Sequence, residues 1–235
     1  MERVISGIRK QLKKSSDEKT RVTSQRHFKE KIKCYGVKTA VVIKMSKENY
    51  TLIKNNSKTD IFELCDILWK SGYIEESYIA CKWSYFIRKE YEPRDFEIFE
   101  KWINTYVNNW VSCDTLCNHT MGAFIEMYPE YLLGLKQFTH SDNRWMRRAS
   151  AVSLIIPARK GMFLNDIFEI ADRLLVDEDD LVQKGYGWML KVASQSHQQE
   201  VFDYVMRQKR IMPRTALRYA IEKMPKEMKR VAMER

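Results

Sequence analysis

A spacing of about 34 residues recurs in the second half of the chain and limits what the chain can fold into. Asp114 lies 34 residues before Arg148, Arg148 lies 36 before Lys184, and Lys184 lies 34 before Arg218. The stretches around these positions are SCDTLCNHTMGAF, WMRRASAVSLII, LVQKGYGWMLKVA and RTALRYAIEKM. Other amphipathic stretches, such as LNDIFEIADRLL, lie between them. A period of this length indicates one pair of helices per repeat.

The rest of the sequence also favours helices. With 8 Gly and 5 Pro in 235 residues, few tight turns are expected, and the alternation typical of strands is nowhere sustained. A helix is predicted over residues 15–36, from the capping residues at 15–17 to Gly36. Further helices are predicted within residues 37–50, 58–72 and 73–92, and Pro93 is well placed to start the next one.

Helix pairs with a period of 34–47 residues are typical of TPR, HEAT and armadillo arrays. Because the TPR consensus is absent, we predict an all-α fold, a right-handed solenoid of HEAT-like repeats with a concave basic groove. The prediction is a single domain over residues 1–235, with basic helices in 1–50 and the clearest repeats in 73–225.

The recurring positions would form a row along the concave face of such an array. Small residues beside them, such as Ala149, Gly185, Gly187 and Ala220, would let the helices approach closely. The alternative is that these are ordinary packing positions between repeats. Asp, Arg and Lys are poor core residues, which favours a binding surface.

The positive charge is concentrated at the two ends of the chain. Residues 1–50 carry 14 Lys/Arg and 5 Asp/Glu, and residues 201–235 carry 10 and 4, so their net charges are +9 and +6. The middle then has a net charge of −5 within a total of +10. This distribution suits a polyanion held at both flanks, although a solvated basic surface would look the same.

Cysteine usage and the absence of long apolar runs bear on the location of the protein. The five cysteines are odd in number and scattered, as expected of buried thiols in a reducing cytosol: Cys34, Cys65, Cys81, Cys113 and Cys117. No apolar run is long enough to cross a bilayer, and the N-terminus lacks a signal peptide. We therefore expect a cytoplasmic protein without membrane attachment.

A metal site is not expected. Cys113, Cys117 and His119 lie near one another, but a second Cys/His pair with the usual ligand spacing is missing. Neither a metal nor another cofactor is predicted.

Trp110 and Asp114 lie four residues apart and would therefore share one face of a helix. The surrounding stretch, NNWVSCDTLC, contains no Lys or Arg. Arg147 and Arg148 come from the next repeat, and Lys184 and Trp188 from the one after it. A single Trp is usually a core residue, and Asp114 alone would be interpreted as a capping carboxylate.

Several of these stretches resemble one known family. NNWVSCD, RWMRRAS and VQKGYGWMLK are similar to signatures of the AlkD-type DNA alkylation repair glycosylases. PRTALRYAIEKM resembles the C-terminal repeat of the family, and KCYGVKTAVVIKMSK resembles an early segment of it. The resemblance covers about residues 25–225, and its most specific parts are W-x-x-x-D, R-R-A and Q-K-x-x-G-W, in that order.

The resemblance implies a HEAT-like DNA glycosylase that excises cationic N3- and N7-alkylated purines from duplex DNA without turning the base into a pocket. Asp114 would be the catalytic carboxylate, Trp110 and Trp188 would surround the deoxyribose, and Arg148 would hold a phosphate. A further aromatic residue of the family falls at His27 or Phe28. We add Arg147, Lys184 and Arg218 as DNA-binding cations, and a monomer is expected.

The chemistry fits these residue types. A cationic alkylpurine leaves without being protonated, so no general acid is required. The remaining sugar has oxocarbenium character and needs an anion and a positioned water, which one carboxylate supplies. The alternatives are a non-catalytic HEAT-repeat DNA-binding protein and a protein scaffold. The basic residues at 148, 184 and 218 do not favour the scaffold.

Overall fold

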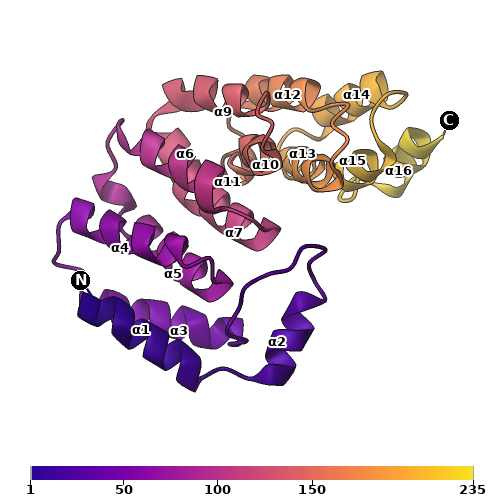
Figure 1. Cartoon of the computed structure of the whole chain (residues 1–235). Coiled ribbons are helices and arrows are strands. Elements are labelled where there is room, and N and C mark those ends of the chain that lie inside the picture. The colour runs from indigo at the N-terminus through magenta and orange to yellow at the C-terminus, as the bar shows by residue number, and fades with distance from the viewer. Residues whose placement is uncertain (1, 235) are drawn as a thin grey trace. The chain divides into compact units, whose positions relative to one another are not determined.

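The computed structural model describes residues 2–234 and consists of helices joined by loops, the longest of which lies between α2 (Glu18–Gln25) and α3 (Thr39–Tyr50) (Figure 1). Within the described residues no strand forms, and the single β-type pairing is an isolated bridge between Lys33 and Tyr73. The prediction of an all-α fold is confirmed. No helix in residues 2–234 combines the length and the apolar character needed to span a bilayer.

The chain divides into two compact units, and the first ends at Leu116. Helices α1, α4 and α6 pack side by side in this unit, and α3, α5 and α7 form a second row against them. The helices are α1 (Glu2–Lys14), α2 (Glu18–Gln25), α3 (Thr39–Tyr50), α4 (Lys58–Lys70), α5 (Ile74–Phe86), α6 (Asp95–Tyr106) and α7 (Trp110–Thr115).

The second unit begins at Cys117, and in it α13 packs between α10 and α15. Helices α9, α12 and α14 lie in the neighbouring row (Figure 1). The bounds are α8 (Gly122–Met127), α9 (Leu132–Phe138), α10 (Arg144–Val152), α11 (Ile155–Arg159), α12 (Leu164–Arg173), α13 (Asp180–Ala193), α14 (Gln198–Gln208), α15 (Arg214–Ala220) and α16 (Lys226–Met233). A single domain over the whole chain stays a prediction.

The period in the sequence arises because the four recurring residues occupy the same position in four different helices. Asp114, Arg148, Lys184 and Arg218 are each the fifth residue of their helix, in α7, α10, α13 and α15 respectively. The spacing of 34–36 residues is therefore the distance between the starts of these helices.

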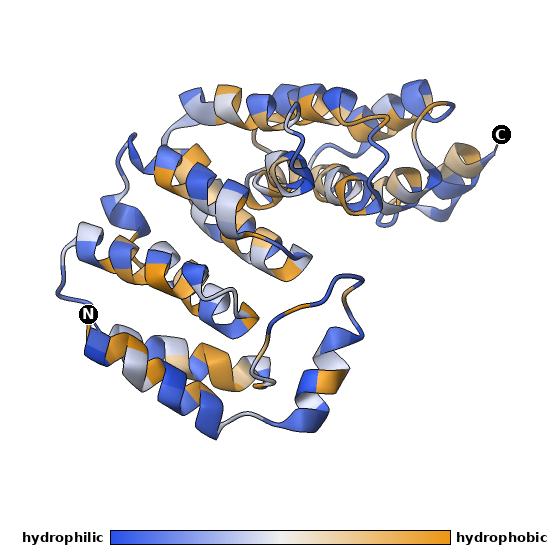
Figure 2. Ribbon diagram, viewed as in Figure 1, coloured by the Kyte–Doolittle hydropathy of each residue, from blue (hydrophilic) through white to orange (hydrophobic). Residues whose placement is uncertain are grey.

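Burial of apolar side chains holds the rows together. Figure 2 shows apolar residues on the helix faces that turn toward neighbouring helices, and the largest fully buried side chains include Trp69, Trp83 and Trp102. In the second unit, a Cβ added at Gly187 would lie 2.7 Å from the Cβ of Tyr219 and 2.8 Å from the carbonyl of Ala216. The close approach of α13 and α15 therefore requires glycine at this position.

The predicted helix over residues 15–36 is wrong beyond Gln25, where α2 ends. Asp17 caps α2 as expected and accepts a hydrogen bond of 2.7 Å from the Thr20 N–H. Residues 26–38 instead form an irregular segment, which we call the α2–α3 loop. Residues 26–28 end the helix in a turn, with N–H groups that donate to the carbonyls of residues 23–25. Farther along, the N–H groups of residues 35–37 bind the side chain of Glu75 in α5 and do not form helical hydrogen bonds.

The buried carboxylate of Glu75, in the first turn of α5, holds the α2–α3 loop. It accepts hydrogen bonds from the N–H groups of Tyr35, Gly36 and Val37 at 3.0, 2.9 and 3.1 Å. Gly36 has a φ of +83°, and a Cβ there would lie 2.6 Å from the Asp17 carbonyl. Gly36 is thus a left-handed turn residue packed under the start of α2, and not the end of a helix.

Candidate active site

Helix α7 presents Trp110 and Asp114 on one partly exposed face. Trp110, Val111 and Asp114 are half-buried, whereas Ser112 and Cys113 are buried on the opposite face. The side chain of Asn109 caps the helix and accepts a hydrogen bond of 2.9 Å from the Ser112 N–H. Exposed and buried positions thus alternate with the period of a helix, and Trp110 and Asp114 share one face, as their four-residue spacing predicts.

The buried face of α7 is tied to α5. The hydroxyl groups of Ser112 and Ser77 lie 2.9 Å apart and share a hydrogen bond in the core of the first unit. This contact fixes the rotation of α7 about its axis. Trp110 and Asp114 lie outside this buried contact and stay half-buried.

The ring of Phe28 stacks on the indole of Trp110. Their centroids lie 5.6 Å apart at an interplanar angle of 27°, and the indole N–H donates a hydrogen bond of 3.4 Å to the carbonyl of His27. The sequence left His27 and Phe28 open as the further aromatic of the site. In the structure Phe28 provides the ring and His27 provides a backbone acceptor.

The side chain of Gln25 closes the part of the α2–α3 loop that carries Phe28. Its amide N–H donates to the Glu30 carbonyl at 2.8 Å, and its amide oxygen accepts from the Ile32 N–H at 3.0 Å. Glu75 holds the loop farther along. Phe28 therefore lies at the tip of a loop that is fixed at both ends.

A pocket of about 220 Å³ adjoins the two rings. Helices α3, α5 and α7 and the α2–α3 loop all contribute to its walls, which include Phe28, Val42, Ile74, Tyr78 and Trp110. Burial raises the pKa of the Tyr78 hydroxyl above its usual value, so this phenol stays neutral at physiological pH. The pocket is thus largely apolar and aromatic, and the two stacked rings form one of its sides.

Arg148 is buried in the second unit, with a relative exposure of 5%. Its guanidinium donates a hydrogen bond to the Leu181 carbonyl, and a Cβ at Gly185 would lie 3.3 Å from its Cγ. The expectation of an exposed row of charges therefore does not hold at this position. Gly185 leaves room for the arginine between α10 and α13.

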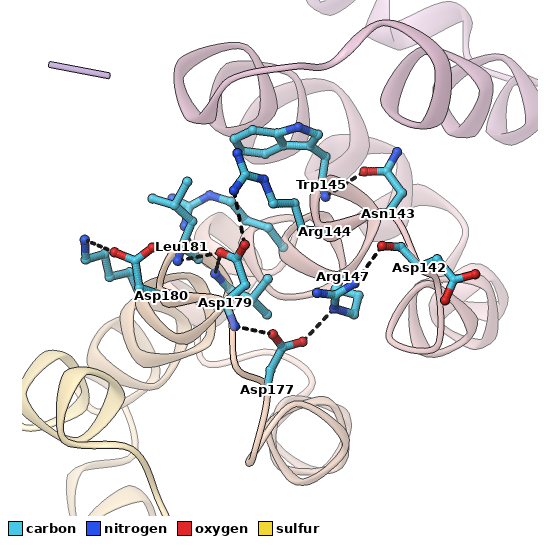
Figure 3. A network of polar contacts seen from close by, with 12 residues as sticks. Asp142, Asn143, Arg144, Trp145, Arg147, Asp177, Asp179, Asp180 and Leu181 are labelled. Atoms are coloured by element: carbon cyan, nitrogen blue, oxygen red, sulfur yellow. Dashed lines mark hydrogen bonds and ion pairs between the residues drawn. The ribbon is translucent and has the colours of Figure 1, made fainter. Parts of the chain in front are cut away.

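Two other predicted DNA-binding cations already have acidic partners, and Figure 3 shows the pair of Arg147 with Asp177. The Nε of Arg147 lies 2.6 Å from the Asp177 carboxylate, and its Nη1 donates to the carbonyls of Ser141 and Asp142 at 2.9 and 3.0 Å. The Nζ of Lys184 lies 3.0 Å from Asp180.

Arg218 is exposed and Trp188 is half-buried. The DNA-binding roles of Arg147, Arg148, Lys184, Trp188 and Arg218 stay predictions.

The thiols follow the expected pattern with one exception. All five cysteines are free, and Cys65, Cys81, Cys113 and Cys117 are buried, but Cys34 is only half-buried. Burial raises the pKa of the Cys34 thiol. Within residues 2–234, no three side chains of the metal-ligating types lie together in a way that could hold a metal ion.

The family model for DNA alkylation repair enzymes matches residues 8–224. The chain belongs to the DNA alkylation repair enzyme family. This confirms the resemblance seen in the sequence motifs. The match includes α7, the α2–α3 loop and the four helices that carry the recurring positions.

A solved structure has the same fold as this family member. It is a predicted DNA alkylation repair enzyme from Enterococcus faecalis, with a TM-score of 0.81 and 15% sequence identity. The similarity covers 90% of this chain and 98% of the other. At this level of identity the comparison shows a shared fold. No curated protein matches the chain at a significant level.

Proposed function

We propose that this member of the family is a monofunctional DNA glycosylase that hydrolyses the N-glycosidic bond of cationic N3- and N7-alkylated purines in duplex DNA. The observation that carries the proposal is the stacked pair of Phe28 and Trp110, one helical turn from Asp114 on the half-exposed face of α7. Aromatic faces and one carboxylate are the groups that an oxocarbenium-like sugar requires.

The reaction begins with departure of the base. A cationic alkylpurine takes the electron pair of the glycosidic bond and leaves as a neutral base, so no proton donor is needed. The carboxylate of Asp114 stabilises the positive charge that develops on the sugar. Each aromatic face adds a cation–π attraction of about 0.5–2 kcal/mol. Water then attacks the anomeric carbon, and Asp114 accepts its proton.

The other predicted residues belong to DNA binding in this proposal. Trp188 is a further aromatic contact, and Arg148, Arg147, Lys184 and Arg218 are contacts to phosphates. Arg147 and Lys184 would exchange Asp177 and Asp180 for phosphate oxygens when DNA binds. The protein would act as a cytoplasmic monomer without a cofactor.

Mass spectrometry of the bases released from methylated duplex DNA tests the proposal. We expect free 7-methylguanine or 3-methyladenine from the wild-type protein, and at least about a tenfold slower release from Asp114→Asn, a loss of about 1.4 kcal/mol in transition-state stabilisation. Asn keeps the size of the side chain and removes its charge. Full activity in this variant would reject Asp114 as the catalytic carboxylate.

A gel shift on the same DNA separates catalysis from binding. If the wild-type protein shifted the duplex but released no base, the non-catalytic DNA-binding alternative would replace the proposal.

A further inference from the structure

A second pocket of the first unit, of about 800 Å³, lies on another side of α2 and the α2–α3 loop. Four of the residues that line it are cationic, namely Arg21, Arg26, Lys31 and Lys33, and none is acidic. Like charges placed together repel one another. A ligand that carries negative charge would relieve this repulsion.

Two of these cations are available to a ligand. Arg21 pairs with Glu18 at 2.7 Å, and the Nζ of Lys33 donates to the Ser71 carbonyl at 2.9 Å. Arg26 and Lys31 are exposed, and no carboxylate in residues 2–234 forms an ion pair with either. The pocket therefore offers one guanidinium and one ammonium group in solvent.

Hydrogen bonds within the α2–α3 loop fix the backbone next to Arg26 and Lys31 before any ligand binds. Arg26 follows directly after Gln25, and Lys31 lies between Glu30 and Ile32, whose backbone groups the Gln25 side chain binds. The same hydrogen bonds that hold Phe28 at the tip of the loop thus hold the two cations at its ends. A ligand of this pocket and the sugar at Trp110 would be bound by one short segment.

The lining of the pocket offers positive charge and no free aromatic face. The only aromatic residue in its lining is Tyr73, and both faces of that ring are occupied. Tyr35 stacks on one face at 4.0 Å, and the Nζ of Lys33 lies 4.4 Å from the ring centre. No aromatic face in this pocket is left for a base to stack on. Phosphate oxygens match the donors that remain.

We propose that Arg26 and Lys31 bind backbone phosphates of the DNA strand close to the damaged nucleotide. The inference rests on the proposed function, because Phe28 of the same loop contacts the candidate active site. DNA is favoured over an anionic membrane for that reason.

The test measures how DNA binding depends on salt. Fluorescence anisotropy of a labelled undamaged duplex, titrated at NaCl concentrations from about 50 to 200 mM, gives the slope of log K against log salt, and each phosphate contact contributes about 0.9 to it. We compare wild type, Arg26→Gln, Lys31→Gln and the double variant. Lys54→Gln is the matched control, since Lys54 is exposed and follows the far end of α3.

We expect the slope to fall by about one in each single variant and by about two in the double variant, with no change in Lys54→Gln. Circular dichroism should show unchanged folding, because both side chains are exposed. An unchanged slope in the double variant would overturn the inference, as would an equal fall in Lys54→Gln. Loss of binding to vesicles of phosphatidylserine and phosphatidylcholine, with DNA binding unaltered, would assign the pocket to a membrane instead.

Base release by the wild-type protein keeps the two proposals apart. If bases are released and the slopes do not change, only the phosphate site is rejected. If no base is released and the slopes fall as expected, Arg26 and Lys31 bind DNA phosphates, but the glycosylase proposal fails and with it the placement of these phosphates beside a damaged nucleotide.

Discussion

At the scale of single residues, the structure shows which of two neighbouring residues places its ring beside Trp110. It is Phe28, which stacks on the indole. His27 and Phe28 are neighbours, and either could supply an aromatic ring. The choice depends on how a loop folds back across more than eighty residues of chain to reach α7. No local pattern records that contact. The pairing of Trp110 with Asp114 was predictable because it depends only on helical spacing.

Removal of the Phe28 ring should slow base release without abolishing it. Loss of one cation–π contact of about 0.5–2 kcal/mol corresponds to a decrease of about twofold to thirtyfold in Phe28→Ala. Phe28→Tyr, which keeps the ring, should stay close to wild type. His27→Ala should be affected less than Phe28→Ala, since His27 contacts Trp110 through its carbonyl. Single-turnover rates of base release from methylated duplex DNA give this comparison. A larger loss of rate in His27→Ala than in Phe28→Ala would show that His27, and not Phe28, supplies the ring of the site.

For Arg148, the sequence predicted the position in its helix but not its burial. Its place as the fifth residue of α10 follows from the repeat. Its burial depends on Gly185, which comes from another helix and leaves the space that the guanidinium fills. A pattern of charges along the sequence does not show which of them will be covered.

At the scale of elements, local signals located most helices correctly. The helix predicted within residues 58–72 is α4, and α6 begins shortly after Pro93. The α2–α3 loop was missed because its conformation is set by a distant carboxylate. Three N–H groups bind Glu75 of α5, and helical propensity within residues 26–36 does not compete with those bonds.

The anchoring of this loop should weaken at alkaline pH. Burial, and next the hydrogen bond of 2.7 Å to the Glu76 carboxylate, raise the pKa of the Tyr35 hydroxyl. Because the folded pKa is the higher one, the contribution of Tyr35 to stability is complete below the unfolded value near 10 and is lost as pH rises through the folded value. The free energy of unfolding should therefore fall above about pH 10.

Tyr35→Phe isolates this contribution from those of other tyrosines. The variant should be less stable than wild type at neutral pH and should lose less stability between about pH 9 and 11. Urea midpoints across that range give the comparison. Parallel curves for the two proteins would show that Tyr35 does not couple the loop to α5.

At the scale of the whole molecule, the period of 34–36 residues was the feature that predicted the most. It anticipated an all-α chain of stacked helices, and four equivalent charged residues do occupy the fifth position of their helices. The division into two compact units after Leu116 was not foreseen, since no shift in composition marks it. The concentration of positive charge at the ends of the chain agrees with the basic pocket beside α2.

The single-turnover rate of 7-methylguanine release by Asp114→Asn, with methylated duplex DNA bound to saturation, tests the central claim most directly. We expect this variant to bind the duplex as tightly as the wild-type protein and to release the base at least about ten times more slowly, since only the charge facing the sugar has been removed. Release at the wild-type rate from the fully bound variant would contradict the assignment of the Trp110–Asp114 face of α7 as the active site.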